Sequence, residues 1–361
     1  MTDTLVGVAS PVFTIAGEAV GALARDCVRL IVNEGVEGLR TLEARFVGTG
    51  VGAPGPPGEL LHLDGTEFDF GTDLQVALGP DGAQHEVFDG TVSGIEVVLG
   101  DSEQVEVVML AEDRLMRLRM THRMRTYTNV TDADVARRIA DAHQLDADVT
   151  VEGPRYDVLQ QVNQSDLAFL RERARRLQAD LWCTGKTLHF SQRPARKGRA
   201  ITLIHGADLL SCSISADLAH QRTDVAVSGF DARREKVIDE HAKADTVRSE
   251  ASGGRTGPEV LQKAFGATAS FRVREVPLTT EEARAWAKAE MLRRARGFVT
   301  ATGTTRGNPE LTVGSLLRLE LVGAPFDGNG YYVTHVTQSY DNVHGLRTTF
   351  TAERATLNQG S

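Results

Sequence analysis

The sequence predicts a mainly β fold with α+β insertions and an internally duplicated β unit. Alternating strand patterns fill both ends of the chain, and helical patterns are confined to its interior. Segment 71–113 also resembles segment 314–354. A chain of 361 residues is long enough for two or more domains, each with its own core.

The first third of the chain is predicted to be almost entirely β. Residues 5–47 alternate apolar and polar side chains in three runs separated by turn-forming residues: "PVFTIAG", "CVRLIVNEG" and "LRTLEARFVG". A loop rich in proline and glycine follows at 48–59. The strand pattern then continues to about residue 112 in "DLQVALG", "HEVFDGTVSGIEVVL" and "QVEVVMLAE".

Residues 119–199 are predicted to form a small α+β module. In "NVTDADVARRIADAHQL", Thr131 is placed to cap a helix, with Asp134 as its capping-box partner. A second helix begins after Ser165 and leads into a hairpin with a three-residue turn, "TGK". The apolar stripe of this helix consists of Leu167, Leu170, Ala174 and Leu177.

Strand patterns return from about residue 200. A polar interval at roughly 231–270 then precedes a third helix. Thr279 and Glu282 are predicted to form its capping box, and Gly297 is predicted to end it. The last 60 residues are again strand-like.

The two similar segments share a glycine, an amphipathic strand, a Gly/Asp turn, an aromatic residue, a long strand and a closing Ala-Glu. The paired residues in this alignment are Gly71 with Gly314, Phe88 with Tyr332, Val92 with Val336 and Glu112 with Glu353. Chance similarity between amphipathic hairpins is the alternative, and agreement to within one residue disfavours it. Two related β units are therefore predicted to bracket the chain.

Charge is unevenly distributed along the chain, whose net charge is −9. Residues 1–113 carry 20 acidic against 4 basic side chains, whereas residues 114–201 carry 17 basic against 10 acidic ones. The basic middle suits either a phosphate backbone or an acidic protein neighbour. As a hypothesis, the acidic first third selects neighbours by charge complementarity.

The sequence also indicates the compartment. No run reaches the eighteen apolar residues of a membrane span, and the first thirty residues lack the features of a signal peptide. We therefore expect synthesis in the cytoplasm and no membrane insertion. Cys27, Cys183 and Cys212 are far apart and odd in number, which predicts free thiols.

The motifs in the sequence indicate no catalytic, cofactor or metal site. "GVGAPG" (50–55) matches a dinucleotide fingerprint, but the prolines that follow forbid the helix this motif requires. His189 and Cys183 come close across the predicted hairpin, yet supply only two of the ligands that zinc needs. We expect no cofactor, no metal and no enzymatic activity. Carboxylate pairs remain open, because partners distant in sequence can meet in space.

The helix after Ser165 carries four arginines outside its apolar stripe: Arg171, Arg173, Arg175 and Arg176. Proteins that bind single-stranded nucleic acid interleave basic residues with stacking aromatics, and Phe169 is the only aromatic residue on this helix. The pattern therefore favours a solvated or partner-facing surface. We assign the four arginines to a protein interface as a hypothesis.

Two elements stand out together: "NVTDADVARRIA…SDLAFLRERARRLQADLWCTGKTLHF" and, far downstream, "GNPELTVGSLLRLELVG…DGNGYYVTHVTQSYD". Together they resemble the phage late control gene D family. That family includes tail hub proteins of contractile phages, hubs of extracellular contractile injection systems and the N-terminal part of the type VI secretion spike protein. The resemblance covers about residues 85–355.

The resemblance implies two tube-type β-barrels per chain, with peripheral α+β modules. We accordingly expect a first barrel at 1–118, the inserted module at 119–199 and a second barrel at 200–235 and 298–357. A second insertion, a loop plus a helix, is expected at 236–297. Three chains would place six similar barrels in a ring that joins a hexameric inner tube to a trimeric spike.

The implied function is that of a structural baseplate hub of a contractile phage tail or contractile injection system. The implied partners are the homotrimer, the inner tube protein, the spike protein and baseplate wedge proteins, with no specific nucleic acid. Because the sequence ends at "TAERATLNQGS", soon after the second unit, the spike is expected to be a separate protein or a part absent from this sequence. Two alternatives stay open: a cell-wall hydrolase of the spike complex, using carboxylates such as Asp166 and Glu172, and a nucleic-acid-binding protein using the arginine-rich helix.

Overall fold

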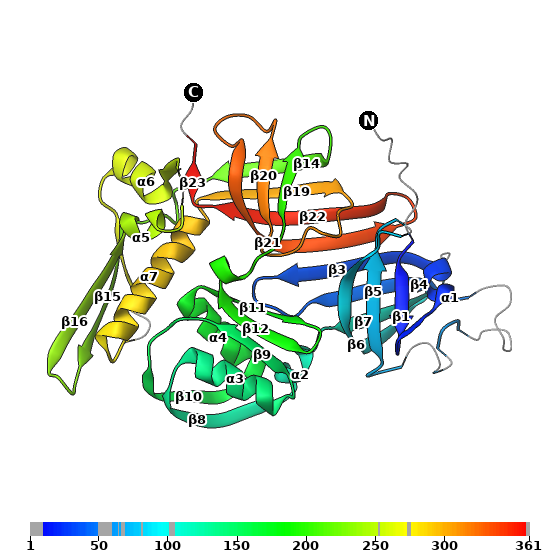
Figure 1. Ribbon diagram of the computed structural model, residues 1–361, viewed down its shortest axis with the longest axis horizontal. Coiled ribbons are helices and arrows are strands. Elements are labelled where there is room, and N and C mark those ends of the chain that lie inside the picture. Colours follow the sequence, from blue (N-terminus) through cyan, green and yellow to red (C-terminus); the bar gives the residue numbers. More distant parts are fainter. Residues whose placement is uncertain are drawn as a thin grey trace.

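A computed structural model describes residues 10–49, 60–63, 65, 69–80, 82–100, 105–251, 253–272 and 276–358. The chain is mainly β, as predicted, and its largest element is a 13-stranded sheet. Figure 1 shows this sheet as two halves, with an α+β module below them and a second insertion projecting to one side.

The first half of the sheet surrounds its own hydrophobic core, to which Phe13, Phe46 and Phe88 contribute fully buried rings. Its strands pair antiparallel in the order β3-β4-β7-β6-β5-β1-β2. The elements are β1 (Val12–Ile15), β2 (Glu18–Ala19), α1 (Gly21–Asp26), β3 (Cys27–Gly35), β4 (Thr41–Val47), β5 (Asp73–Leu78), β6 (His85–Val98) and β7 (Glu106–Glu112).

The second half surrounds a separate core that includes Phe298, Tyr331 and Phe350. Its strands pair in the order β14-β19-β22-β21-β20-β13, antiparallel except for the parallel pair β20 and β13. The elements are β13 (Ala200–Ile204), β14 (Leu209–Ala216), β19 (Val299–Arg306), β20 (Leu316–Glu320), β21 (Gly328–Asp341) and β22 (Gly345–Arg354).

The two halves repeat one another strand by strand. In chain order β3, β4, β5, β6 and β7 correspond to β14, β19, β20, β21 and β22, and the pairings within each set are the same. The repeat extends to irregularities, because β6 and β21 each shift register against their partner at one place, after Val92 and after Val333. The predicted duplication is therefore present in the fold.

The residue alignment of the duplication needed a correction. The Gly71 N–H donates to the Val92 carbonyl at 2.9 Å, and the Gly314 N–H donates to the Val333 carbonyl at 3.0 Å. Val92 therefore corresponds to Val333, not to Val336. In the same alignment the counterpart of Tyr332 is Thr91, not Phe88. The sequence alignment takes the distances along the chain from Gly71 and from Gly314 as nearly equal. The hairpins before β6 and β21, however, differ in length and in the position of their bulges.

The α+β module has the local structure that the sequence predicts. Thr131 and Asp134 form a complete capping box, and the Ser165 hydroxyl accepts from the Ala168 N–H. The hairpin turn, however, contains only Gly185 and Lys186, because Thr184 pairs directly with Thr187. The elements are α2 (Met116–Arg119), β8 (His122–Val130), α3 (Asp132–Ala142), β9 (Asp146–Thr150), β10 (Tyr156–Ser165), α4 (Asp166–Leu177), β11 (Ala179–Thr184), β12 (Thr187–Gln192) and η1 (Arg193–Ala195).

The second insertion is larger than predicted. It begins with β15, which pairs with β16 and β18 rather than with strands of either half, so 224–235 belongs to this insertion. Thr279 caps α7, but Glu282 accepts from the Leu278 N–H, and the predicted capping box is only half formed. The elements are β15 (Asp224–Asp231), β16 (Lys236–Lys243), α5 (Ala244–Arg248), β17 (Arg255–Thr256), α6 (Gly257–Phe265), β18 (Ala269–Arg272) and α7 (Thr280–Arg296). β17 pairs with β23 (Thr356–Leu357), which follows the second half of the sheet.

Candidate functional site

The seam between β3 and β21 is the first part of the candidate site, because it joins the two halves. The strands pair antiparallel from Gly35 opposite His335 to Arg29 opposite Asp341. On the face away from the cores, the Thr337 hydroxyl donates to Asn33 Oδ1 at 2.7 Å. On the core face, Tyr340 of β21 packs into the first core and is only 4% exposed. The halves therefore share backbone pairing and core packing.

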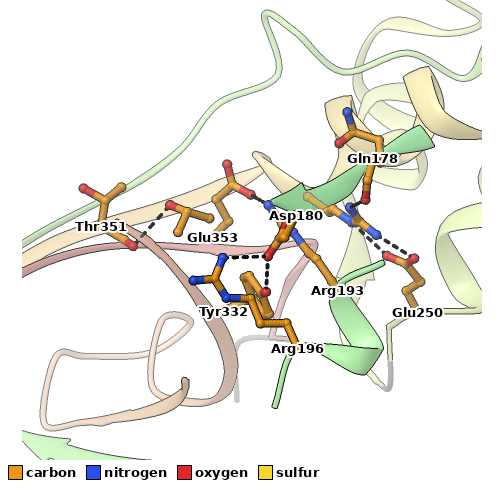
Figure 2. Close-up of polar contacts among 10 residues, drawn as sticks. Gln178, Asp180, Arg193, Arg196, Glu250, Tyr332, Thr351 and Glu353 are labelled. Atoms are coloured by element: carbon orange, nitrogen blue, oxygen red, sulfur yellow. Dashed lines mark hydrogen bonds and ion pairs between the residues drawn. The ribbon is translucent and has the colours of Figure 1, made fainter. Parts of the chain in front are cut away.

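A polar junction fixes the module against this seam (Figure 2). Arg196 Nη2 donates to Glu34 Oε1 of β3 at 2.7 Å, and its Nη1 lies 3.5 Å from Asp180 Oδ2 of β11. The Tyr332 hydroxyl of β21 donates to the same Asp180 oxygen at 2.6 Å. Three elements distant in sequence thus meet around one buried guanidinium.

Neighbouring contacts surround Arg196. Its guanidinium lies 4.4 Å from the ring centre of Trp182, a cation–π distance. Arg193 donates to Glu353 Oε2 at 2.6 Å and lies over the ring of Tyr332. Burial acts to raise the pKa of Glu34, but the guanidinium groups of Arg40 and Arg196 outweigh it and hold that pKa below its usual value. Glu34 therefore stays charged at neutral pH.

These junction residues were not predicted. Arg193, Arg196 and Lys197 belong to the basic run "QRPARKGR", which in the sequence is distinguished only by its charge. An open cleft of about 610 Å³ lies beside them, lined also by Arg296 and Glu250. Arg193, Arg196 and Arg296 all hold carboxylates, so the cleft offers an anion no unpaired arginine.

All four arginines predicted to contact a partner protein make contacts within the chain. Arg171 donates to the backbone carbonyls of Glu37 and Gly38, both at 2.9 Å. Arg175 forms a two-point ion pair with the Glu37 carboxylate. Both contacts dock α4 onto the turn between β3 and β4.

The other two arginines of α4 serve the module and α7. Arg173 is 1% exposed and pairs with Asp132 of α3, so its assignment to a partner surface is wrong. A side chain this deeply buried cannot reach a second protein. Arg176 pairs with Glu172 and lies over the ring of Trp286 of α7. Among the four, Arg175 is the most exposed, at 61% of its side chain.

The residues considered for catalysis are held in local networks. Asp166 is buried and accepts from Gln161, Arg123 and His143 at 2.8–2.9 Å. Burial acts to raise the pKa of Asp166, and these hydrogen bonds lower it further than burial raises it. The pKa of Glu172 is lowered in the same way by Gln164 and Arg176. A glycosidase acid requires a raised pKa, so neither carboxyl fits that role.

The residues of the metal and nucleotide motifs either make other contacts or lie outside the described part of the chain. His189 lies opposite Trp182 rather than Cys183, stacks on its ring at 4.6 Å and contacts Asp148. Within the described ranges, no group of three or more His, Cys, Asp and Glu side chains could hold a metal ion. "GVGAPG" (50–55) lies outside the described residues. None of the described helices is long and apolar enough to cross a membrane.

Solved structures of phage tail and secretion proteins share this fold. The 43 kDa tail protein of prophage MuSo2 from Shewanella oneidensis aligns over 96% of this chain and 98% of its own, with a TM-score of 0.69 and 14% identity. The tail protein of Neisseria meningitidis MC58 aligns over 96% of both chains, with a TM-score of 0.64 and 11% identity.

An Escherichia coli component of the type VI secretion system, described as structurally similar to the T4 bacteriophage tail proteins gp27 and gp5, aligns over 97% of this chain and 79% of its own. Its TM-score is 0.57 and its identity 13%. The family model described as the Alg8 N-terminal domain matches residues 62–342. A comparison with curated proteins gave no match. The structural likeness confirms the predicted fold.

Replacing Arg173 by Met should destabilise the chain strongly, because it leaves the Asp132 carboxylate buried without its cation. The expected loss is about 3–5 kcal/mol of unfolding free energy. Arg175→Met is the matched control on the same helix, and should cost no more than about 1 kcal/mol because that ion pair is largely exposed. Urea unfolding of the two variants compares them, and equal losses would contradict the assignment.

Asp113, which directly follows β7, should make the stability of the folded chain depend on pH. Burial raises its pKa to about 6 from an ordinary 3.8, although the N–H groups of Arg40 and Leu115 act to lower it. Between these values the folded chain holds a proton that the unfolded chain has released, so this group's contribution to stability falls as pH rises and is lost above pH 6. Asp113→Asn removes that titration. The stability of the variant relative to the parent, measured by urea unfolding, should rise from pH 4 to pH 6; a flat difference would contradict this.

Proposed function

We propose that this chain, which belongs to the Alg8 N-terminal domain family, is a structural baseplate hub of a contractile phage tail or contractile injection system. In this role three copies form a pseudo-six-fold ring between a hexameric inner tube and a trimeric spike. The hub acts by geometry and not by catalysis. Its fold, shared with phage tail proteins, supports this role.

The observation that carries the proposal is the strand-by-strand repeat. Each chain presents two halves with the same strand order and the same register shifts, already joined edge to edge by β3 and β21. Two similar units per chain convert three-fold symmetry into six similar positions. If a strand pairing like that of β3 with β21 also formed between chains, the ring would close without any new kind of contact.

The face of the joined sheet away from the cores suits a channel wall. In the second half this face is dominated by hydroxyl side chains, and some bond to one another across strands, as Ser215 does with Thr300 at 2.9 Å. The group is Ser211, Ser213, Ser215, Thr300, Thr302, Thr304, Thr337, Ser339, Thr349 and Thr351. We assign this face to the lumen; beside the hydroxyl groups of the second half it carries charged side chains of the first half, among them Glu43 and Arg45, which pair with one another.

The peripheral parts are assigned to neighbouring proteins. In Figure 1 the module lies below the joined sheet and the second insertion projects to its left, and we assign these two parts to contacts with baseplate wedge proteins and the sheet to contacts with tube and spike. The exposed Arg175 remains a proposed partner contact. Assembly is proposed to take place in the bacterial cytoplasm.

Light scattering tests the proposal. The purified chain, at high concentration or with tube or spike protein added, should show a particle of three chains, about 117 kDa or three times 39.1 kDa. A strict monomer under all these conditions would contradict the hub assignment. Cell-wall hydrolysis by the purified chain, or retention on DNA at physiological salt, would instead favour the hydrolase or the nucleic-acid-binding alternative.

A further inference from the structure

Two strand edges within the described residues lack a backbone partner, although their counterparts in the other half are paired. β14 is the counterpart of β3, and from Ser211 to Ala216 it bonds to β19 on one side only. On β6, the residues after Val92 bond to β7 on one side, whereas the matching part of β21 bonds to both β22 and β3. One chain therefore carries both strand edges needed for a second seam, that of β14 and that of the end of β6, but does not pair them with each other.

The apolar side chains along these edges point to the same conclusion. In the existing seam Leu30, Val32, Val336 and Tyr340 are all buried. Their counterparts are Cys212, Ile214, Ile95 and Leu99. The first three are only half-buried, and Leu99 is 74% exposed. Pairing the two edges would bury these four side chains, as the existing seam buries their counterparts. The exposed apolar side chains along the edges therefore indicate an interface that a single chain does not form.

We propose that β14 of one copy pairs antiparallel with the end of β6 of a second copy, and that this seam repeats the one between β3 and β21. The inference rests on the proposed hub function and names its subunit contact. Within one chain β14 and β6 do not pair with each other, because six strands of the same sheet lie between them: β19, β22, β21, β3, β4 and β7. The occupant of the β14 edge is therefore another copy of this chain.

The repeat fixes the register of the proposed seam. Arg29 and Ser211 both lie just past the register shift of their strands, opposite Arg45 and Thr304, so β3 aligns with β14. Replacing each residue of the existing seam by its counterpart gives the four central residue pairs between β6 of one copy and β14 of the next. They are Ile95 opposite Ala216, Glu96 opposite Ser215, Val97 opposite Ile214 and Val98 opposite Ser213.

The proposed contact is head-to-tail, because its two surfaces differ. Such contacts build a closed ring when the rotation between copies closes, and a filament when it does not. Leu99 would enter the core of the second half of the next copy, as Tyr340 enters the first core within the chain. This places one exposed leucine of each copy in an apolar site of its neighbour.

Engineered cysteines test the register. Glu96 and Ser215 are the counterparts of Thr337 and Asn33, whose side chains touch in the existing seam at 2.7 Å. Directly opposed residues are close enough for a disulfide. In a Cys212→Ala background, oxidised Glu96→Cys/Ser215→Cys protein should give covalent species of two and three chains on a non-reducing gel, and Thr337→Cys/Asn33→Cys should close within one chain.

The matched control is Glu96→Cys/Ser211→Cys, four residues out of register or about 13 Å along the strand, which should give at least tenfold less cross-linked product. A 117 kDa particle with no cross-link at Glu96 and Ser215, while the Thr337 and Asn33 control closes, would overturn this seam and leave the hub function standing. A chain that stays monomeric would overturn both. Covalent products longer than three chains would support the seam and contradict a three-chain ring.

Discussion

The pairing of β3 with β21 is the constraint on which the rest of this fold depends. It joins residues 29–35 to residues 335–341, so nearly the whole chain forms one closed loop. The module and the second insertion must fit between these fixed ends. Closing so long a loop costs conformational entropy, and the seam offsets that cost with backbone hydrogen bonds and with Tyr340 in the opposite core. The halves therefore form one continuous sheet.

Electrostatics holds the module against this sheet. The acidic first third and the basic middle of the sequence meet inside one molecule: Glu34 pairs with Arg196, Glu37 with Arg175, and Glu112 with Arg119. Much of the charge asymmetry is thus used within the chain, and less of it is available to select partners than the sequence suggested. Arg196 is the most constrained of these groups, because its guanidinium lies between Glu34, Asp180 and Trp182.

Local rules predicted the local structure well. Caps at Thr131 and Ser165 follow from short-range hydrogen bonding, and the duplication is visible because both copies keep their glycine and closing Ala-Glu. The failures are long-range. Only the tertiary structure shows that Arg173 faces Asp132 and that 224–231 joins α7. The three-residue error at Val336 arose because hairpin loops change length without changing the strand pairing that follows.

The central claim is that two equivalent halves per chain make a ring with six similar positions. Electron microscopy of the assembled particle, averaged in views along its axis, tests this most directly. The account predicts three-fold symmetry, an open centre and six similar densities around it, with the modules alternating outside. A two-fold particle, or three-fold averages without six similar inner densities, would contradict it.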